Sequence, residues 1–161
     1  MKKEYVSRAD IAISAISQSE SVARSLVAVA VSPLDPTVEE LADLRCAVSE
    51  AVTNAIVHGY GNGAGTLLGE RAPMVYISVR LFADRSVTVE IRDRGVGIAD
   101  IKRAREPLFT TDTTGERSGM GFAVMEAFTD RVRVSSKVGR GTKVVLTKQL
   151  GERGGKRDSA E

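Results

Sequence analysis

The chain has 161 residues, of which 42% are hydrophobic and 27% charged, a composition typical of a globular protein with one domain. Its net charge of +2 does not indicate a nucleic-acid or acidic membrane partner, and no apolar run approaches the roughly 20 residues that span a bilayer. With one histidine and one cysteine (Cys46), it has neither the ligands of a common zinc site nor an internal disulfide, and a reducing cytoplasm is the expected compartment.

The N-terminal part of the chain predicts a strand followed by a helix. Residues 4–13 are rich in β-branched side chains and predict the strand. Ser19 or Ser21 is expected to cap the helix, which should end near Pro33 because the residue before a proline disfavours helical backbone.

A second helix is predicted from a capping-box pattern. Thr37 is followed three residues later by Glu40, which is the spacing of that motif. The helix should continue to about His58 and stop at Gly59. The following residues, 59–73, contain five glycines and a proline and predict a flexible loop.

The C-terminal half predicts two pairs of adjacent strands separated by a long loop and one helix. Residues 74–82 and 86–93 form the first strand pair, joined by a tight turn. Residues 93–121 are turn-rich without a clear period, 121–130 predict a short amphipathic helix, and 132–150 predict a second hairpin.

Adjacent strands imply hairpins, and hairpins imply an antiparallel sheet. The element order therefore predicts an α+β two-layer sandwich, with a mostly antiparallel mixed sheet and helices on one face. We expect one domain over residues 1–150 and a disordered, charged, glycine-rich tail over residues 151–161.

The second helix carries a polar pair on one face. Glu50 and Asn54 lie one turn apart, and the simplest interpretation is the solvated face of an amphipathic helix. However, no Lys or Arg occurs between Arg45 and Arg71, so this face could instead be covered or line a cavity. In that setting the carboxylate could act as a general base and the amide oxygen could bind Mg²⁺.

Two glycine clusters also allow two interpretations each. The segment 91–98 ends a strand in D-x-G-x-G, which is either an ordinary Asp-Gly turn or a place where Asp93 accepts a hydrogen bond from a ligand amine. The segment 117–122 puts Gly119 and Gly121 at a helix start, which is either a flexible entry or a phosphate site beside Arg117.

In combination, these patterns resemble the GHKL (Bergerat-type) ATP-binding superfamily. Within it, SEAVTNAIVHGY, IRDRGVGI, REPLFTT and ERSGMGF, with SQSESVAR upstream, are similar to the anti-sigma factors of spore-forming bacteria, which are serine-protein kinases. The similarity covers roughly residues 4–149, and only the segment 61–73 is longer than the family's usual connection.

The resemblance implies a role for each matching residue. Glu50 would be the general base, Asn54 a Mg²⁺ ligand and Asp93 the acceptor for the adenine amine. Arg24 matches a position that contacts protein partners. Further nucleotide contacts are implied for Gly95, Gly97, Ile98, Thr110, Thr111, Arg117, Ser118, Gly119, Met120, Gly121 and Thr142.

The implied function has two parts on one scaffold. With ATP bound, the family holds a sporulation sigma factor of RNA polymerase inactive, and it phosphorylates a serine of an anti-anti-sigma protein. ATP or ADP and Mg²⁺ are the implied cofactors, and a homodimer is implied, for which the strand at residues 4–13 is the expected interface.

Three alternatives share the nucleotide fold. A sister kinase would control a stress-response sigma factor with the same chemistry. A sensor histidine kinase would need dimerisation helices with a phospho-accepting histidine, whereas the only histidine here, His58, lies in the ATP helix and is expected to pack or cap its end. A nucleotide-gated binding module would lack kinase activity, against which the Glu50 and Asn54 pair argues.

Overall fold

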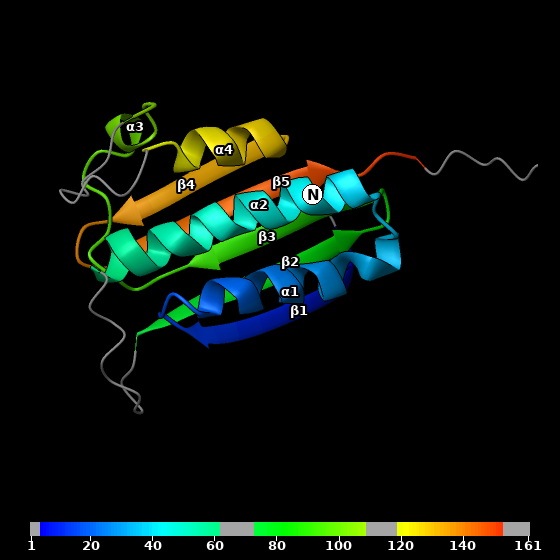
Figure 1. Cartoon of the computed structure of the whole chain (residues 1–161), viewed down its shortest axis with the longest axis horizontal. Helices are drawn as coiled ribbons and strands as arrows, with labels where there is room; N and C mark the ends of the chain where they lie inside the picture. The colour runs from blue at the N-terminus through cyan, green and yellow to red at the C-terminus, as the bar shows by residue number, and fades with distance from the viewer. Residues whose placement is uncertain (1–3, 62–72, 109–118, 153–161) are drawn as a thin grey trace, which may run out of the picture.

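The computed structural model of the protein describes residues 4–61, 73–108 and 119–152 (Figure 1). The strands are β1 (Tyr5–Ser14), β2 (Met74–Phe82), β3 (Ser86–Arg92), β4 (Arg131–Lys137) and β5 (Gly141–Gln149). The helices are α1 (Ser19–Val31), α2 (Val38–Asn54), α3 (Ile101–Ala104) and α4 (Gly121–Phe128), with a 3₁₀ turn η1 (Ser32–Leu34) and a π-helical turn η2 (Ala55–Gly59). Among the helices of the described residues, none is both long enough and apolar enough to span a membrane.

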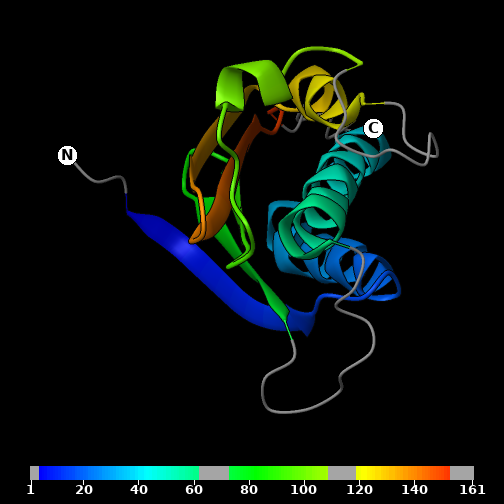
Figure 2. The same ribbon diagram turned by 90° about the vertical axis from the view of Figure 1, so that its left-hand side faces the viewer.

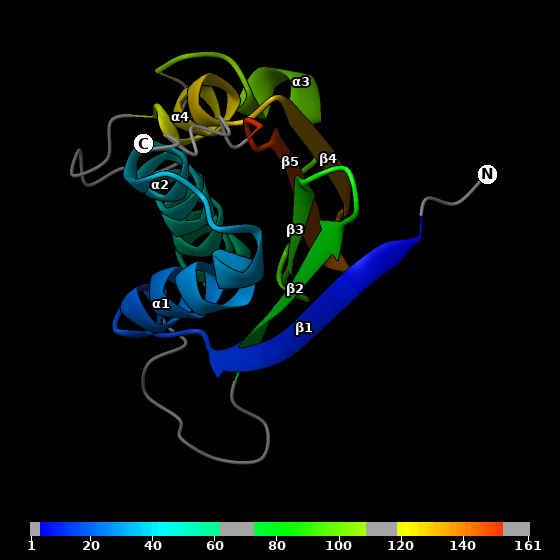
Figure 3. The same ribbon diagram turned by 90° about the vertical axis from the view of Figure 1, so that its right-hand side faces the viewer.

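The strands form one sheet in the order β1-β2-β3-β5-β4, and each neighbouring pair is antiparallel. Figures 2 and 3 show α1, α2 and α4 against the same face of this sheet. The predicted α+β two-layer sandwich is confirmed, and within the described residues its sheet is wholly antiparallel rather than mixed.

Period-two alternation explains why the sheet has one covered face. In β2, Val75, Ile77, Val79 and Leu81 are buried against the helices, while Tyr76, Ser78 and Arg80 point to the other face. β3 and β5 contribute Val87, Val89, Ile91, Val144 and Leu146 to the same core. Removal of this apolar surface from water is what joins the two layers.

Helix α2 lies between α1 and α4 and crosses the middle of the sheet (Figure 1). Its predicted capping box is confirmed, because Thr37 Oγ1 accepts from the Glu40 N–H at 3.1 Å and Glu40 Oε2 accepts from the Thr37 N–H at 2.8 Å. The predicted serine cap of α1 is wrong. Gln18 precedes that helix without a side-chain cap, and the Ser21 hydroxyl donates to the Gln18 carbonyl instead.

Helix α3 lies within the segment that the sequence predicts as a loop. The Asp100 carboxylate accepts from the Arg103 N–H at 3.0 Å and so caps the helix N-terminus. A helix of four residues is too short to give a hydrophobic period, which is why the pattern did not reveal it.

The Glu40 carboxylate gives the fold a measurable dependence on acid pH. Hydrogen bonds from the Gly151 and Thr37 N–H groups lower the pKa of Glu40 below its ordinary value of 4.5. Because the folded-state pKa is the lower one, this stabilisation is present above about pH 4.5 and is lost as the pH falls through the folded-state value. We expect Glu40→Gln to be less stable than wild type in urea unfolding at pH 7. The difference should shrink below pH 4, and a constant difference from pH 7 to pH 3 would contradict this account.

Candidate nucleotide site

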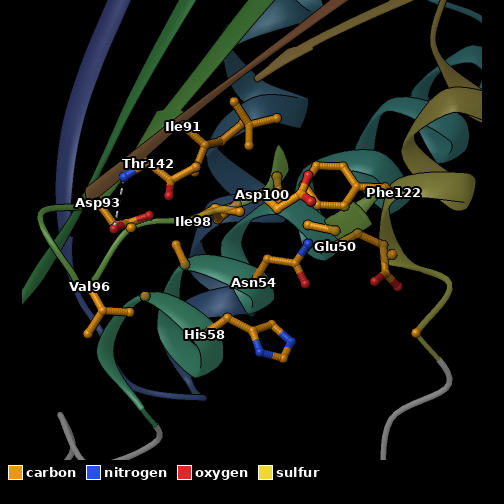
Figure 4. A pocket seen from close by; sticks show the side chains of 18 of the residues that line it. Glu50, Asn54, His58, Ile91, Asp93, Val96, Ile98, Asp100, Phe122 and Thr142 are labelled. Atoms are coloured by element: carbon orange, nitrogen blue, oxygen red, sulfur yellow. Dashed lines mark hydrogen bonds between the residues drawn. The ribbon is translucent and has the colours of Figure 1, made fainter. Parts of the chain in front are cut away.

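A cavity of about 730 Å³ opens between α2 and the segment that follows β3. Its walls come from α2 and η2, the residues from Ile91 to Ala104, the start of α4, and β5 (Figure 4). A volume of this size lies within the range of small-molecule and cofactor sites.

Most of the predicted site residues that the structure describes meet in this cavity. It is lined by Glu50, Asn54, Asp93, Gly97, Ile98, Gly119, Met120, Gly121 and Thr142. Gly95 lies between two of the lining residues on the same loop. Thr110, Thr111, Arg117 and Ser118 lie outside the described residues.

The wall formed by α2 carries the polar pair. Glu50 and Asn54 are half-buried and line the cavity, so this face of the helix is not an ordinary solvated face. A Cβ atom on Gly121 would lie 3.0 Å from Glu50 Oε2 and 3.3 Å from Asn54 Oδ1. The start of α4 therefore approaches the pair directly, and a glycine there leaves the space between them open.

The opposite wall is formed by Asp93, a residue that is 4% exposed. Its Oδ1 accepts from the Gly95 N–H at 2.8 Å and from the Thr142 N–H at 3.2 Å. Burial raises the pKa of Asp93, and these two hydrogen bonds act in the opposite direction. Asp93 thus makes the local Asp-Gly turn and also lines the cavity.

Two glycines of this segment allow close backbone contacts. A Cβ atom on Gly95 would lie 1.9 Å from the Gly59 carbonyl oxygen, where no side chain fits. Gly97 has a φ of +75°, and its Cβ atom would lie 2.3 Å from the Lys137 carbonyl oxygen. The loop is therefore fixed between the end of η2 and the turn that joins β4 to β5.

Sequence reasoning missed several residues of the cavity. His58, which the sequence places at the end of its helix without a site role, also lines the cavity, two helical turns from Glu50 (Figure 4). The spacing of four residues from Asn54 could have indicated this position. Asp100 and Phe122 also line the cavity, and no local pattern marks either of them.

Arg24 lies on α1 and is not among the residues of the cavity. Its guanidinium pairs with Glu20 at 3.2 Å, and its buried Nε has no hydrogen-bond partner in the described residues. Glu20 also accepts a hydrogen bond from Ser49, which is adjacent in sequence to Glu50. Arg24 is therefore connected to α2 through one shared carboxylate.

Comparison with known proteins identifies the family. The model of the histidine kinase-like ATPase domain matches residues 14–148. The anti-sigma F factor of Geobacillus sp. (strain WCH70) is 53% identical over 137 residues, which are 85% of this chain and 88% of that protein. This chain belongs to the anti-sigma F factor family.

Other anti-sigma F factors match a similar share of the chain. The protein of Thermoanaerobacter sp. (strain X514) is 45% identical over 92% of this chain and 97% of its own length. That of Clostridium acetobutylicum is 48% identical over 83% and 87%, respectively. Membership brings a histidine kinase-like ATPase domain, and with it nucleotide binding.

Solved structures support the fold of this family. The crystal structure of the RsbU and RsbW domains of a Mycobacterium tuberculosis protein matches 91% of this chain and 33% of that chain, with a TM-score of 0.60 and 18% identity. A blue-light-activated histidine kinase of Erythrobacter litoralis matches 70% of this chain and 45% of its own, with a TM-score of 0.51 and 20% identity.

Proposed function

We propose that this chain transfers the terminal phosphoryl group of ATP to a serine of an anti-anti-sigma protein, and that with nucleotide bound it inhibits a sporulation sigma factor. The observation that carries the proposal is the meeting of Glu50, Asn54 and Asp93 in one cavity of a chain of this family. Asp93 accepts a hydrogen bond from the adenine amine at one wall of the cavity, and Glu50 and Asn54 act at the phosphate end.

At the phosphate end, Glu50 takes the proton of the attacking serine hydroxyl. Asn54 would hold Mg²⁺ through its amide oxygen, and the ion when bound would neutralise charge on the phosphates. Among residues 4–61, 73–108 and 119–152, no group of three or more His, Cys, Asp or Glu side chains could hold a metal ion. A hard cation at Asn54 therefore fits a site in which substrate phosphates and water supply the other ligands.

The phosphates would lie at the start of α4. Gly119 has a φ of +67°, and Gly119, Met120 and Gly121 all line the cavity. The first N–H groups of a helix have no intrahelical acceptor, and the helix dipole favours negative charge there. We propose that these N–H groups hold the phosphates together with Arg117 and Ser118, and that Thr110 and Thr111 also contact the nucleotide.

We propose that Arg24 is part of the surface that binds the protein partners. The guanidinium is half-exposed, and within the described part of the chain it forms an ion pair with Glu20 on its own helix. It is thus available to a carboxylate on another protein. We also propose a homodimer through β1, which is an edge strand of the described sheet and exposes Tyr5 and Val6.

Charge reversal at Arg24 tests the partner surface. We expect Arg24→Glu to weaken sigma-factor binding on the order of tenfold, because an attractive contact becomes repulsive, while ATP affinity stays unchanged. Arg45→Glu, a reversal at another exposed arginine, is the matched control. Equal sigma affinity of Arg24→Glu and wild type in a titration would remove Arg24 from the interface.

The kinase reaction is tested by incubating the protein with labelled ATP, Mg²⁺ and candidate anti-anti-sigma proteins. We expect labelled phosphoserine on one of them. Transfer only to a partner of a stress-response sigma factor would identify the chain as the sister kinase. ATP-dependent sigma binding without transfer to any candidate would leave a nucleotide-gated binding module and contradict the kinase proposal.

A further inference from the structure

Tyr60 directly follows η2 and precedes the segment 61–73, and its hydroxyl joins two distant backbone positions. The hydroxyl donates to the Met74 carbonyl oxygen at 2.8 Å and accepts from the Arg94 N–H at 2.8 Å. The side chain is half-buried, and burial raises the pKa of Tyr60, so the hydroxyl keeps its proton at neutral pH.

The Arg94 N–H belongs to the peptide unit that joins Asp93 to Arg94. The next residues are fixed by the same end of the helix, since the Val96 N–H donates to the Gly59 carbonyl oxygen at 2.9 Å. Gly59 itself faces Asp93, because a Cβ atom on Gly59 would lie 3.0 Å from the Asp93 carboxyl carbon. Tyr60 and Gly59 thus hold the Asp93 loop at successive points along its backbone.

The Met74 contact extends this arrangement to the other end of the segment. Tyr60 precedes residues 61–73 and Met74 follows them, so one hydroxyl joins both ends. The adjacent residue, Pro73, accepts a hydrogen bond from the Ala15 N–H at 2.8 Å, which ties the same point to the end of β1. The longer connection of this chain therefore begins and ends at a fixed point beside the Asp93 loop.

We propose that Tyr60 is a positioning residue for base recognition, which holds the Asp93–Arg94 peptide unit and thereby directs the Asp93 carboxylate toward the adenine amine. The proposal rests on the proposed nucleotide function. It adds that the affinity for the adenine part of ATP depends on a hydroxyl that does not touch the nucleotide. Contacts at the phosphate end, which α2 and α4 supply, do not depend on it.

The test compares Tyr60→Phe with Tyr76→Phe by calorimetric titration with ATP and with inorganic tripolyphosphate, both with Mg²⁺. Tyr76 is a matched control, because its ring lies on the other face of the sheet, 5.4 Å from the Arg92 guanidinium and 4.9 Å from that of Arg94. We expect Tyr60→Phe to weaken ATP binding about 2- to 10-fold, the value of one hydrogen bond, and to leave tripolyphosphate binding unchanged. Tyr76→Phe should change neither.

Each outcome of the test decides between the two proposals. Unchanged ATP affinity in Tyr60→Phe, or an equal loss for ATP and tripolyphosphate, would overturn the positioning role while leaving the nucleotide site in place. A wild-type protein that binds no ATP would overturn the proposed function and this inference with it. Thermal melting of both variants shows whether a loss of affinity comes with a loss of the fold.

Discussion

Glu50→Gln is expected to lower the rate of serine phosphorylation by about 10²- to 10⁴-fold, the usual contribution of a general base. The amide has the shape of the carboxylate and fits the same space beside Gly121, but it cannot take the hydroxyl proton. ATP affinity should therefore stay close to that of wild type. Single-turnover transfer to the anti-anti-sigma protein measures the rate, and equilibrium dialysis measures the affinity.

Asn54→Ala is the comparison that separates the two members of the pair. It removes the proposed Mg²⁺ ligand, so the loss of ATP affinity should be large with Mg²⁺ and small without it. If Glu50→Gln lost as much affinity as Asn54→Ala, the division of roles between base and metal ligand would be wrong.

Gly95→Ala is expected to disturb both the fold and the site. Its new methyl group would lie 1.9 Å from the Gly59 carbonyl oxygen, and neither backbone can relieve the overlap by a side-chain rotation. Overpacking of this kind costs about 1–3 kcal/mol of unfolding free energy. Because the Gly95 N–H also donates to Asp93, ATP affinity should fall with it. Urea unfolding and calorimetric titration measure the two effects.

Gly151→Ala is the control for this substitution. A methyl group there would lie 3.5 Å from the Glu40 carboxylate, which is an ordinary contact, and the change in stability should stay within about 0.5 kcal/mol. Wild-type stability and affinity in Gly95→Ala would show that the loop and the end of η2 are not packed as closely as described.

The fold was predictable where its signals are local. The alternation of β2 and β3 and the Thr37–Glu40 capping box each depend on residues close in sequence, and the structure has both. The predicted stop at Gly59 is only approximate, because α2 ends at Asn54, η2 continues through Gly59, and the glycine with positive φ at that end is Gly61. The start of α1 was not predictable in the same way, because serines are common caps but Gln18 occupies that position.

The site was less predictable, because it depends on contacts between distant segments. The Glu50 and Asn54 pair, the Asp93 turn and the Gly121 helix start each allowed an ordinary interpretation, and only the order of the motifs joined them. The bonds from Tyr60 to Met74 and Arg94 span up to 34 residues and leave no pattern in the sequence. Asp100 likewise reaches the cavity from a helix too short to recognise.

Equilibrium dialysis of the wild-type protein with labelled ATP and Mg²⁺ tests most directly whether α2, the Asp93 loop and the start of α4 form one nucleotide site. The account predicts saturable binding of one ATP per chain, displaced by ADP and weakened by substitution of either Asn54 or Asp93. Binding that does not saturate would contradict it. So would an ATP affinity that stays at the wild-type value after substitution of Asn54 and after substitution of Asp93.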